Sequence, residues 1–283
     1  MASELTLPPS TRAERKLLAG LARRRERRDQ GLVLCEGMTL LGEALAAGLA
    51  PQLVAVSDEL RASAPETVDA LLASAGAAGA RLVALDKTHV DQVSQTKAGT
   101  GLVAAVVAPA GWDAHWASAG PALVPVLWGL QDPGNVGMLL RSARAFGATG
   151  CLLTSGSADP TGPKAVRASA GAALHLPCAD LSDEAALDGL ATDRETVVVT
   201  ASPPRGAQAA PLSLPPRCLL VLGHETRGVP ELAGARPVSI PQTPEVESLN
   251  VGVAGAVLMA AWYGAHGARR AEGAGTHATD PAP

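Results

Sequence analysis

The sequence has 283 residues, of which 47% are hydrophobic and only 2% aromatic, and its formal net charge is −4. This length allows two ordinary domains whose cores are built from Ala, Val and Leu. No run of about 20 apolar residues is present, and the first ten residues lack a basic start followed by an apolar stretch. We therefore expect no membrane span and no secretory signal, and predict a cytoplasmic protein.

The cysteines and histidines lack the spacing of a metal site. The four cysteines form no CxxC pair and the six histidines show no ligand pattern. We therefore expect buried, reduced thiols and no metal. The cysteines are Cys35, Cys151, Cys178 and Cys218.

Basic residues are concentrated near the start of the chain. Residues 12–28 hold eight Arg or Lys residues against Glu14 and Glu26. The run is either a solvated helix face or a phosphate-binding patch, for which the local field matters more than the total charge. The candidate RNA-binding residues of this segment are Arg23, Arg24, Arg25, Arg27 and Arg28.

Strands alternate with helices over the next 80 residues. Apolar runs predict strands at 32–36, 53–56, 81–85 and 101–107, and periodic apolar residues predict helices around 40–45, 68–75 and 89. The alternation is typical of a compact α/β sandwich, which we assign to residues 1–108 together with the basic segment. Pro, Gly and Ala with two tryptophans predict a linker over 109–121.

A second α/β unit is predicted over residues 122–266. Residues 267–283 are small and polar, and we expect them to be disordered. The pattern alone favours an unknotted doubly wound sheet, because knots are rare exceptions. The predicted strands are 124–127, 151–154, 197–200, 218–223 and 238–240, with helices between them and a final helix over 250–265.

Three segments of the second unit carry polar residues directly after predicted strands. In the first, Asp132, Pro133 and Gly134 end the strand, and Asn135 stands where a helix N-cap belongs. Arg141 follows about one and two-thirds turns later, near the face that carries Asn135. A capped helix with a surface arginine is the alternative interpretation.

The second segment surrounds two glycines. Gly223 and Gly228 permit backbone turns that side chains would obstruct. Glu225 lies at the carboxyl end of a predicted strand, where α/β sheets tend to bind ligands. An ordinary loop is the alternative.

The third segment is an apolar loop that leads into the final helix. It places Ser248 and Asn250 at the helix start. These residues are either ordinary helix caps or part of a loop that wraps an adenine and presents backbone N–H groups.

Taken in this order, the three segments resemble the SpoU/TrmH family of RNA 2′-O-ribose methyltransferases. The family patterns NxGxxxRxAxxFG and LGxExxG are matched from Asn135 and Leu222 onward, and IPM…SLNVxVA is matched from Ile240 onward except at its Met. Lys164 and Arg167 resemble a further KxxRxSxG element. The resemblance covers about residues 122–265. The first unit is similar to the family's substrate-binding domain, an L30e-like fold shared with certain ribosomal proteins.

The resemblance implies a trefoil-knotted α/β catalytic domain that binds S-adenosylmethionine and methylates RNA. It also implies a homodimer through the knotted domain, with an active site shared between subunits. The implied catalytic residues are Asn135, Arg141, Glu225, Ser248 and Asn250; the implied cofactor-binding residues are Thr200, Leu222, Gly223, Gly228, Ile240 and Leu249; and Lys164 and Arg167 join the RNA-binding set.

Three residues depart from the family pattern. His224 stands where Asn or Ala is more usual, Gln242 where Met is usual and Gly252 where Ser is common. The last two departures would loosen the cofactor pocket, although the main pattern is kept.

The full N-terminal unit favours ribosomal RNA, with 23S rRNA as the expected substrate and transfer RNA as the alternative; no DNA or membrane partner is expected. A non-catalytic RNA-binding or ribosome-assembly protein of the same fold is a second alternative. The presence together of four expected site residues counts against it: Asn135, Arg141, Glu225 and Asn250. A nucleotide-dependent oxidoreductase is a third. Residues 99–104 fit the GxGxxA pattern of dinucleotide-binding proteins, but they lead into a β-rich run rather than opening a helix, which disfavours the oxidoreductase.

Overall fold

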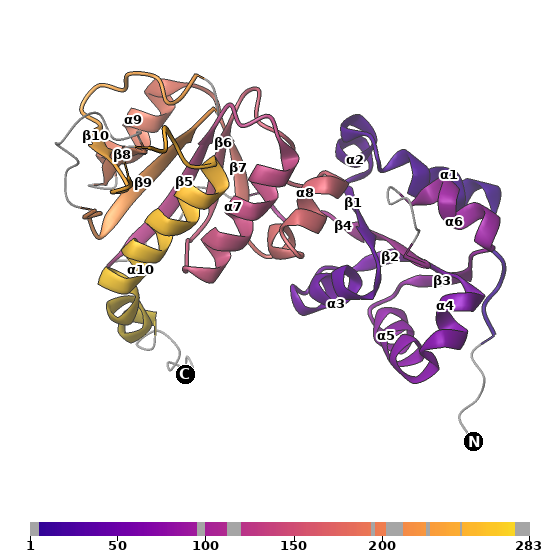
Figure 1. Cartoon of the computed structure of the whole chain (residues 1–283). Coiled ribbons are helices and arrows are strands. Elements are labelled where there is room, and N and C mark those ends of the chain that lie inside the picture. Colours follow the sequence, from indigo (N-terminus) through magenta and orange to yellow (C-terminus); the bar gives the residue numbers. More distant parts are fainter. Residues whose placement is uncertain are drawn as a thin grey trace, which may run out of the picture. The chain divides into compact units, whose positions relative to one another are not determined.

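The computed structural model describes residues 6–94, 100–111, 120–193, 196–201, 212–224, 227–243 and 245–274. The chain folds into two compact units (Figure 1). One consists of residues 1–110 and 159–175, and the other of residues 111–158 and 176–283. Residues 159–175, which the sequence analysis placed in the second domain, thus belong structurally to the first unit.

The first unit contains a four-stranded sheet in the order β1-β4-β2-β3. Strand β4 is antiparallel to β1 and β2, whereas β2 and β3 are parallel. The elements are α1 (Arg12–Gly20), α2 (Arg24–Gln30), β1 (Leu32–Glu36), α3 (Met38–Ala46), β2 (Pro51–Val56), α4 (Asp58–Ser63), α5 (Pro65–Ala77), β3 (Arg81–Ala84), α6 (Lys87–Val93) and β4 (Leu102–Val107).

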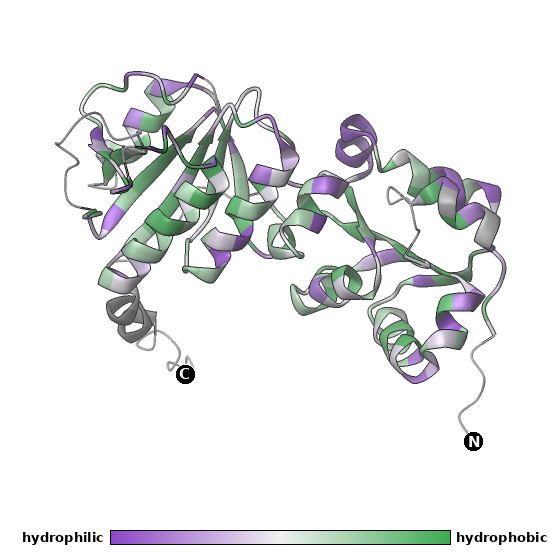
Figure 2. Ribbon diagram, in the orientation of Figure 1, coloured by the Kyte–Doolittle hydropathy of each residue, from purple (hydrophilic) through white to green (hydrophobic). Residues whose placement is uncertain are grey.

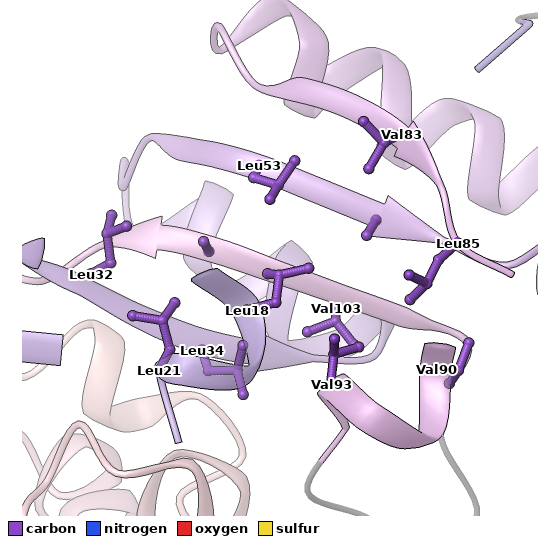
Figure 3. Packing of buried hydrophobic residues seen from close by; sticks show 12 residues of the cluster. Leu18, Leu21, Leu32, Leu34, Leu53, Val83, Leu85, Val90, Val93 and Val103 are labelled. Atoms are coloured by element: carbon purple, nitrogen blue, oxygen red, sulfur yellow. The ribbon is translucent and has the colours of Figure 1, made fainter. Parts of the chain in front are cut away.

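Helices cover both faces of this sheet. Figure 3 shows Leu18 of α1 and Val93 of α6 packed over one face, against Leu34 of β1. Side chains alternate along a strand, so the equally buried Val33 points to the other face, on the side of α3 and α5. Burial on both faces explains why β1 reads as an uninterrupted apolar run in the sequence.

Residues 159–175 complete the first unit with α8 (Pro163–Ala168) and a single 3-10 turn, η1 (Ala172–Leu174). Polar contacts fasten the segment at three places. They join Arg27 to Asp159 (2.5 Å), Glu36 to Arg167 (2.6 Å) and Glu43 to His175 (2.8 Å).

The second unit contains six parallel strands in the order β10-β8-β9-β5-β6-β7. The central strands β5, β6, β8 and β9 are largely apolar, and most of their ribbons are green in Figure 2. The elements are β5 (Ala122–Trp128), α7 (Pro133–Ala145), β6 (Cys151–Thr154), β7 (Cys178–Leu181), α9 (Glu184–Asp193), β8 (Val197–Ala201), β9 (Arg217–Gly223), β10 (Arg236–Val238) and α10 (Val251–Ala274).

Helix α9 covers one face of the second sheet, while α7 and α10 lie side by side on the other (Figure 1). Leu187 of α9 packs in a cluster with Val221 of β9. The next residue, Leu222, points to the opposite face, where Gly255 of α10 lies against it. The result is a three-layered α/β/α unit.

The predicted strands are present, and β1 and β6 have the predicted bounds. Strand β10 (Arg236–Val238) shares only Val238 with the predicted strand 238–240, and α4 and β7 were not predicted. Helix α10 continues to Ala274, so the prediction of disorder from residue 267 is wrong as far as residue 274, and 275–283 lie outside the described residues. Within the described ranges, no helix is both long enough and apolar enough to span a membrane.

Candidate functional site

The motif segments of the second unit meet at one edge of its sheet. Strands β10, β8, β9 and β5 are parallel neighbours, so the segments that follow them leave from the same edge. The register places Trp128 beside Gly223 and Thr200 beside Val221. This carboxyl edge is where open α/β sheets bind ligands.

The loop after β5 leads into α7 through a side-chain cap. Asp132, not Asn135, is the N-cap, because its carboxylate accepts a hydrogen bond from the Asn135 backbone N–H at 3.2 Å. Pro133 follows at the first helical position, where its missing N–H costs nothing. The predicted N-cap was therefore placed three residues too late.

This shift leaves the Asn135 side chain available to another part of the chain. Its carbonyl Oδ1 accepts a hydrogen bond from Asn250 Nδ2 at 3.1 Å. Asn250 Oδ1 in turn accepts hydrogen bonds from the backbone N–H groups of Gly252 (2.9 Å) and Val253 (3.3 Å) and thereby caps α10. A buried amide of the first motif is thus joined to the helix cap of the third, 115 residues later.

Small residues allow α10 to approach α7 and β9 closely. A Cβ on Gly255 would overlap Leu139 of α7 and lie 3.0 Å from Leu222 of β9. A Cβ on Gly252 would lie 2.9 Å from the methyl group of Met138. Glycine at position 252, one of the three departures from the expected pattern, therefore makes room for Met138.

The second motif forms a tight turn at the end of β9. His224 and Gly228 exchange two backbone hydrogen bonds, of 3.1 and 2.8 Å. Gly228 has φ +67°, a conformation that side chains disfavour. A Cβ on Gly223 would overlap the Gly228 carbonyl, so the turn closes only over a glycine. Glu225, a predicted catalytic residue, lies outside the described residues.

The third motif begins with an exposed loop. Gln242 Nε2 donates a hydrogen bond to the Val246 carbonyl at 2.9 Å and so closes the loop on itself. Val246 (47% exposed) and Leu249 (37%) present apolar side chains to solvent, and Ile240 is half-buried. Ser248 is exposed beside Leu249.

Arg141 does not share a face with Asn135. Six residues at about 100° each place the two side chains about 120° apart around the helix. Asn135 is buried, whereas Arg141 is exposed. The prediction of a common face is therefore wrong, although both residues lie on α7.

The remaining predicted residues differ in accessibility. Thr200 is buried near the end of β8, and the Leu222 side chain is fully buried in the core. The Leu222 side chain therefore packs in the core, and only its backbone could contact a ligand. Lys164 is exposed on α8, and Arg167 pairs with the buried Glu36.

Arg27 is the clearest correction among the predicted RNA-binding residues. It is only 5% exposed, and its guanidinium donates to Asp159 and to the carbonyls of Leu21 and Ala22, both at 2.9 Å. A guanidinium engaged in this way is not presented to a phosphate. We therefore reassign Arg27 to a structural role in the first unit.

Two residues that the sequence analysis did not select also support the edge. Thr154 Oγ1 accepts a hydrogen bond from the Gly129 N–H at 2.9 Å, and Ser157 Oγ donates one to the Leu127 carbonyl at 2.9 Å. Thr154 is the last residue of β6 and Ser157 follows it, so polar residues at the carboxyl end of a strand, the signal that selected the other loops, were present here too.

Two buried thiols lie away from the carboxyl edge and are not available as nucleophiles. Desolvation raises the pKa of Cys218 in β9 to about 12, so this thiol is protonated at neutral pH. Burial and the neighbouring Glu36 carboxylate raise the pKa of Cys35 in the first unit to about 12 as well.

We expect the Asn135–Asn250 bridge to stabilise the second unit measurably. Asn135→Ala and Asn250→Ala, alone and together, should give a coupling free energy of about 0.5–1.5 kcal/mol in a double-mutant cycle. Asn250→Ala should be the more destabilising single change, by about 1–3 kcal/mol, because it also removes the α10 cap. Urea denaturation measures all four proteins, and strictly additive effects would contradict the bridge.

A parallel α/β unit with polar motif loops at its carboxyl edge, joined in one chain to a second α/β unit, defines a two-domain α/β protein with a candidate ligand site. Residues 122–260 match the SpoU rRNA Methylase family, and residues 14–104 match the MRM3-like substrate binding domain. A Synechocystis sp. protein named as an uncharacterized tRNA/rRNA methyltransferase is 34% identical over 252 residues, which are 86% of this chain and 88% of that protein. The chain therefore belongs to the SpoU rRNA methylase family of RNA methyltransferases.

Two further relatives are informative. The 23S rRNA (guanosine(2553)-2′-O)-methyltransferase RlmP of Bacillus subtilis is 31% identical over 133 residues, which are 46% of this chain and 53% of that protein. A solved structure of an RNA 2′-O ribose methyltransferase superposes with a TM-score of 0.73 at 28% identity and covers 90% of this chain and 97% of that one.

Proposed function

We propose that the chain transfers a methyl group from S-adenosylmethionine to a ribose 2′-hydroxyl of RNA, with 23S rRNA as the substrate. The observation that carries the proposal is the Asn135–Asn250 bridge, because it joins two family motifs at the carboxyl edge of the sheet. The family, the 2′-O activity named for the relatives and the 23S rRNA named for the Bacillus subtilis protein agree with it.

The loops at the edge suit this cofactor. Ile240, Val246 and Leu249 offer apolar side chains to an adenine, while Gly223 and Gly228 leave the backbone at these two positions of the turn without side chains. We assign cofactor binding to these loops and to the end of β8 at Thr200. When bound, S-adenosylmethionine supplies an activated methyl group on a positively charged sulfur.

The protein must then orient the hydroxyl and ease the loss of its proton. Orientation alone is worth up to about 7–11 kcal/mol. A guanidinium stays protonated at neutral pH, so we assign Arg141 to holding the acceptor phosphate or hydroxyl and stabilising charge, rather than to proton abstraction. Asn135, Ser248 and Asn250 order the site, as does Glu225 by its position in the motif.

We also infer the finer features that the family implies. These are a trefoil knot formed by the loops around Gly223–Gly228 and 239–250, and an L30e-like fold for the first unit. The four-stranded mixed sheet of that unit is compatible with such a fold.

A homodimer through the second unit is part of the proposal. Met138 of α7 and Val253, Val257 and Tyr263 of α10 are 37–47% exposed, on two helices that pack together. A second copy of this chain would cover these apolar side chains and bring a neighbour close to Arg141. A single-chain mass in sedimentation equilibrium would contradict the dimer.

Radiolabelled methyl transfer tests the proposed reaction and its substrate. Protein-free 23S rRNA, 16S rRNA and bulk tRNA are each incubated with the protein and labelled S-adenosylmethionine. We expect label in 23S rRNA that survives alkaline hydrolysis in a dinucleotide, because a methylated 2′-hydroxyl cannot assist strand cleavage. Label in tRNA alone would show that the substrate is tRNA and not 23S rRNA. Cofactor binding without transfer to any RNA, or no cofactor binding, would contradict the proposal.

A further inference from the structure

A largely buried ion pair joins α2 of the first unit to the turn that precedes α8. Arg27 Nη2 of α2 lies 2.5 Å from Asp159 Oδ2, at the turn that leads into α8. Asp159 Oδ1 accepts hydrogen bonds from the Thr161 N–H (2.9 Å) and hydroxyl (2.7 Å), and these shape the turn. The pair therefore fixes where α8 begins relative to α2.

The Asp159 carboxylate is held in its charged form. Burial works to raise its pKa, but hydrogen bonds from Arg27 and Thr161 outweigh this effect and lower the pKa below the ordinary value of 3.8. At neutral pH the buried pair is therefore intact.

Positive charge remains in excess around this pair. Arg24 Nε lies 3.8 Å from the same Asp159 oxygen, and its side chain is 48% exposed. One carboxylate cannot neutralise two guanidinium groups. Arg27 is the buried one of the two, and Arg24 is the exposed one. Helix α2 is purple along its length in Figure 2.

The local net charge around α2 and α8 is opposite in sign to the net charge of the whole chain. Residues 23–30, 159–168 and the Arg167 partner Glu36 together hold seven basic and four acidic side chains, an excess of three positive charges in a chain of net charge −4. Two of the acids, Glu26 and Asp29, pair with arginines of the same helix. Local excesses of this kind attract phosphate more than the total charge predicts.

We propose that α2 and α8 form one phosphate-binding surface for RNA, in which Arg24, Arg28 and Lys164 contact the backbone and the Arg27–Asp159 pair positions the two helices. All three cationic residues are exposed on elements of the first unit. Contacts of this kind hold the substrate without reading its sequence. This surface rests on the proposed function, because the RNA it holds is the methyl acceptor.

The salt dependence of RNA binding tests the surface. The probe is protein-free 23S rRNA, titrated between about 50 and 200 mM NaCl, where phosphate contacts dominate. Arg24→Ala and Lys164→Ala should each reduce the slope of log K against log salt by about 0.7–0.9, and the double variant by about twice that. Arg12→Ala removes an exposed arginine of α1 in the same unit and should leave the slope unchanged.

A charge-matched pair of variants tests the positioning role. Asp159→Asn and Asp29→Asn each remove one negative charge from this region. Coulomb's law alone predicts that both strengthen RNA binding. We expect Asp29→Asn to do so slightly, and Asp159→Asn instead to weaken binding several-fold, because α8 and Lys164 lose their fixed place. Equal strengthening by both changes would overturn the positioning role.

The outcomes separate this inference from the proposed function. Unchanged salt slopes in the Arg24 and Lys164 variants, with methyl transfer intact in the wild type, would overturn the surface alone. A wild-type protein that binds no RNA and transfers no methyl group would overturn both. Cofactor affinity should be the same in all these variants, since each change lies in the first unit.

Discussion

Arg141→Ala should lower the single-turnover rate of methyl transfer by about 100- to 1000-fold, the range found when one preorganised charge-stabilising group is removed from other enzymes. The residue is exposed on α7, six positions after Asn135, so its side chain is presented to a substrate rather than committed to the core. The affinity for S-adenosylmethionine should change less than about twofold, because the proposed cofactor loops follow β8, β9 and β10. Rapid-quench transfer and isothermal titration measure the two quantities.

Matched variants on the same helix make this prediction specific. Arg144→Ala removes an equal charge from an exposed position three residues later and should change the rate less than about threefold. Arg141→Lys keeps the charge but loses the planar fork, and should recover only part of the rate. A rate in Arg141→Ala above half that of the wild type would remove Arg141 from the proposed site.

Most of the fold follows from the sequence because its strands are buried on both faces. Strands such as β1 and β9 are continuous apolar runs between polar or glycine-containing turns, a pattern that has few other interpretations. Strand β7 (Cys178–Leu181) was missed because only Leu181 is buried and no period is visible. Helix α10 was predicted too short because Ala, Gly and Arg beyond Gly267 look polar or flexible without the helix that precedes them.

The motif loops of the site were predicted from the sequence, but the side-chain contacts between distant segments were not. The three motif loops follow parallel strands, so their meeting at one edge is a consequence of topology. The Asn135–Asn250 bridge spans 115 residues, and the Arg27–Asp159 pair spans 132. No local pattern reveals such partners, which is why Asn135 was taken for a helix cap and Arg27 for an RNA ligand.

Gly223→Ala should lower the affinity for S-adenosylmethionine at least tenfold, a change of about 1.4 kcal/mol in binding free energy. The added methyl would overlap the carbonyl group of Gly228 and lie 2.5 Å from the Val229 nitrogen, so backbone rather than a flexible side chain must move. The two hydrogen bonds between His224 and Gly228 hold that backbone in place and would be strained or broken. Isothermal titration measures the affinity.

The same overlap should lower stability by about 1–3 kcal/mol, the usual cost of inserting a methyl group into a closely packed place. Gly189→Ala is the matched control, because a Cβ there meets no atom within 4 Å and the residue lies inside α9. Alanine is the better helix former by about 0.5–1 kcal/mol, so this control should be as stable as the wild type or more so, with unchanged cofactor binding. If Gly223→Ala bound the cofactor as tightly as Gly189→Ala, the turn between residues 223 and 228 would not be part of the cofactor site, and binding would have to be assigned to the loops after β8 and β10 alone.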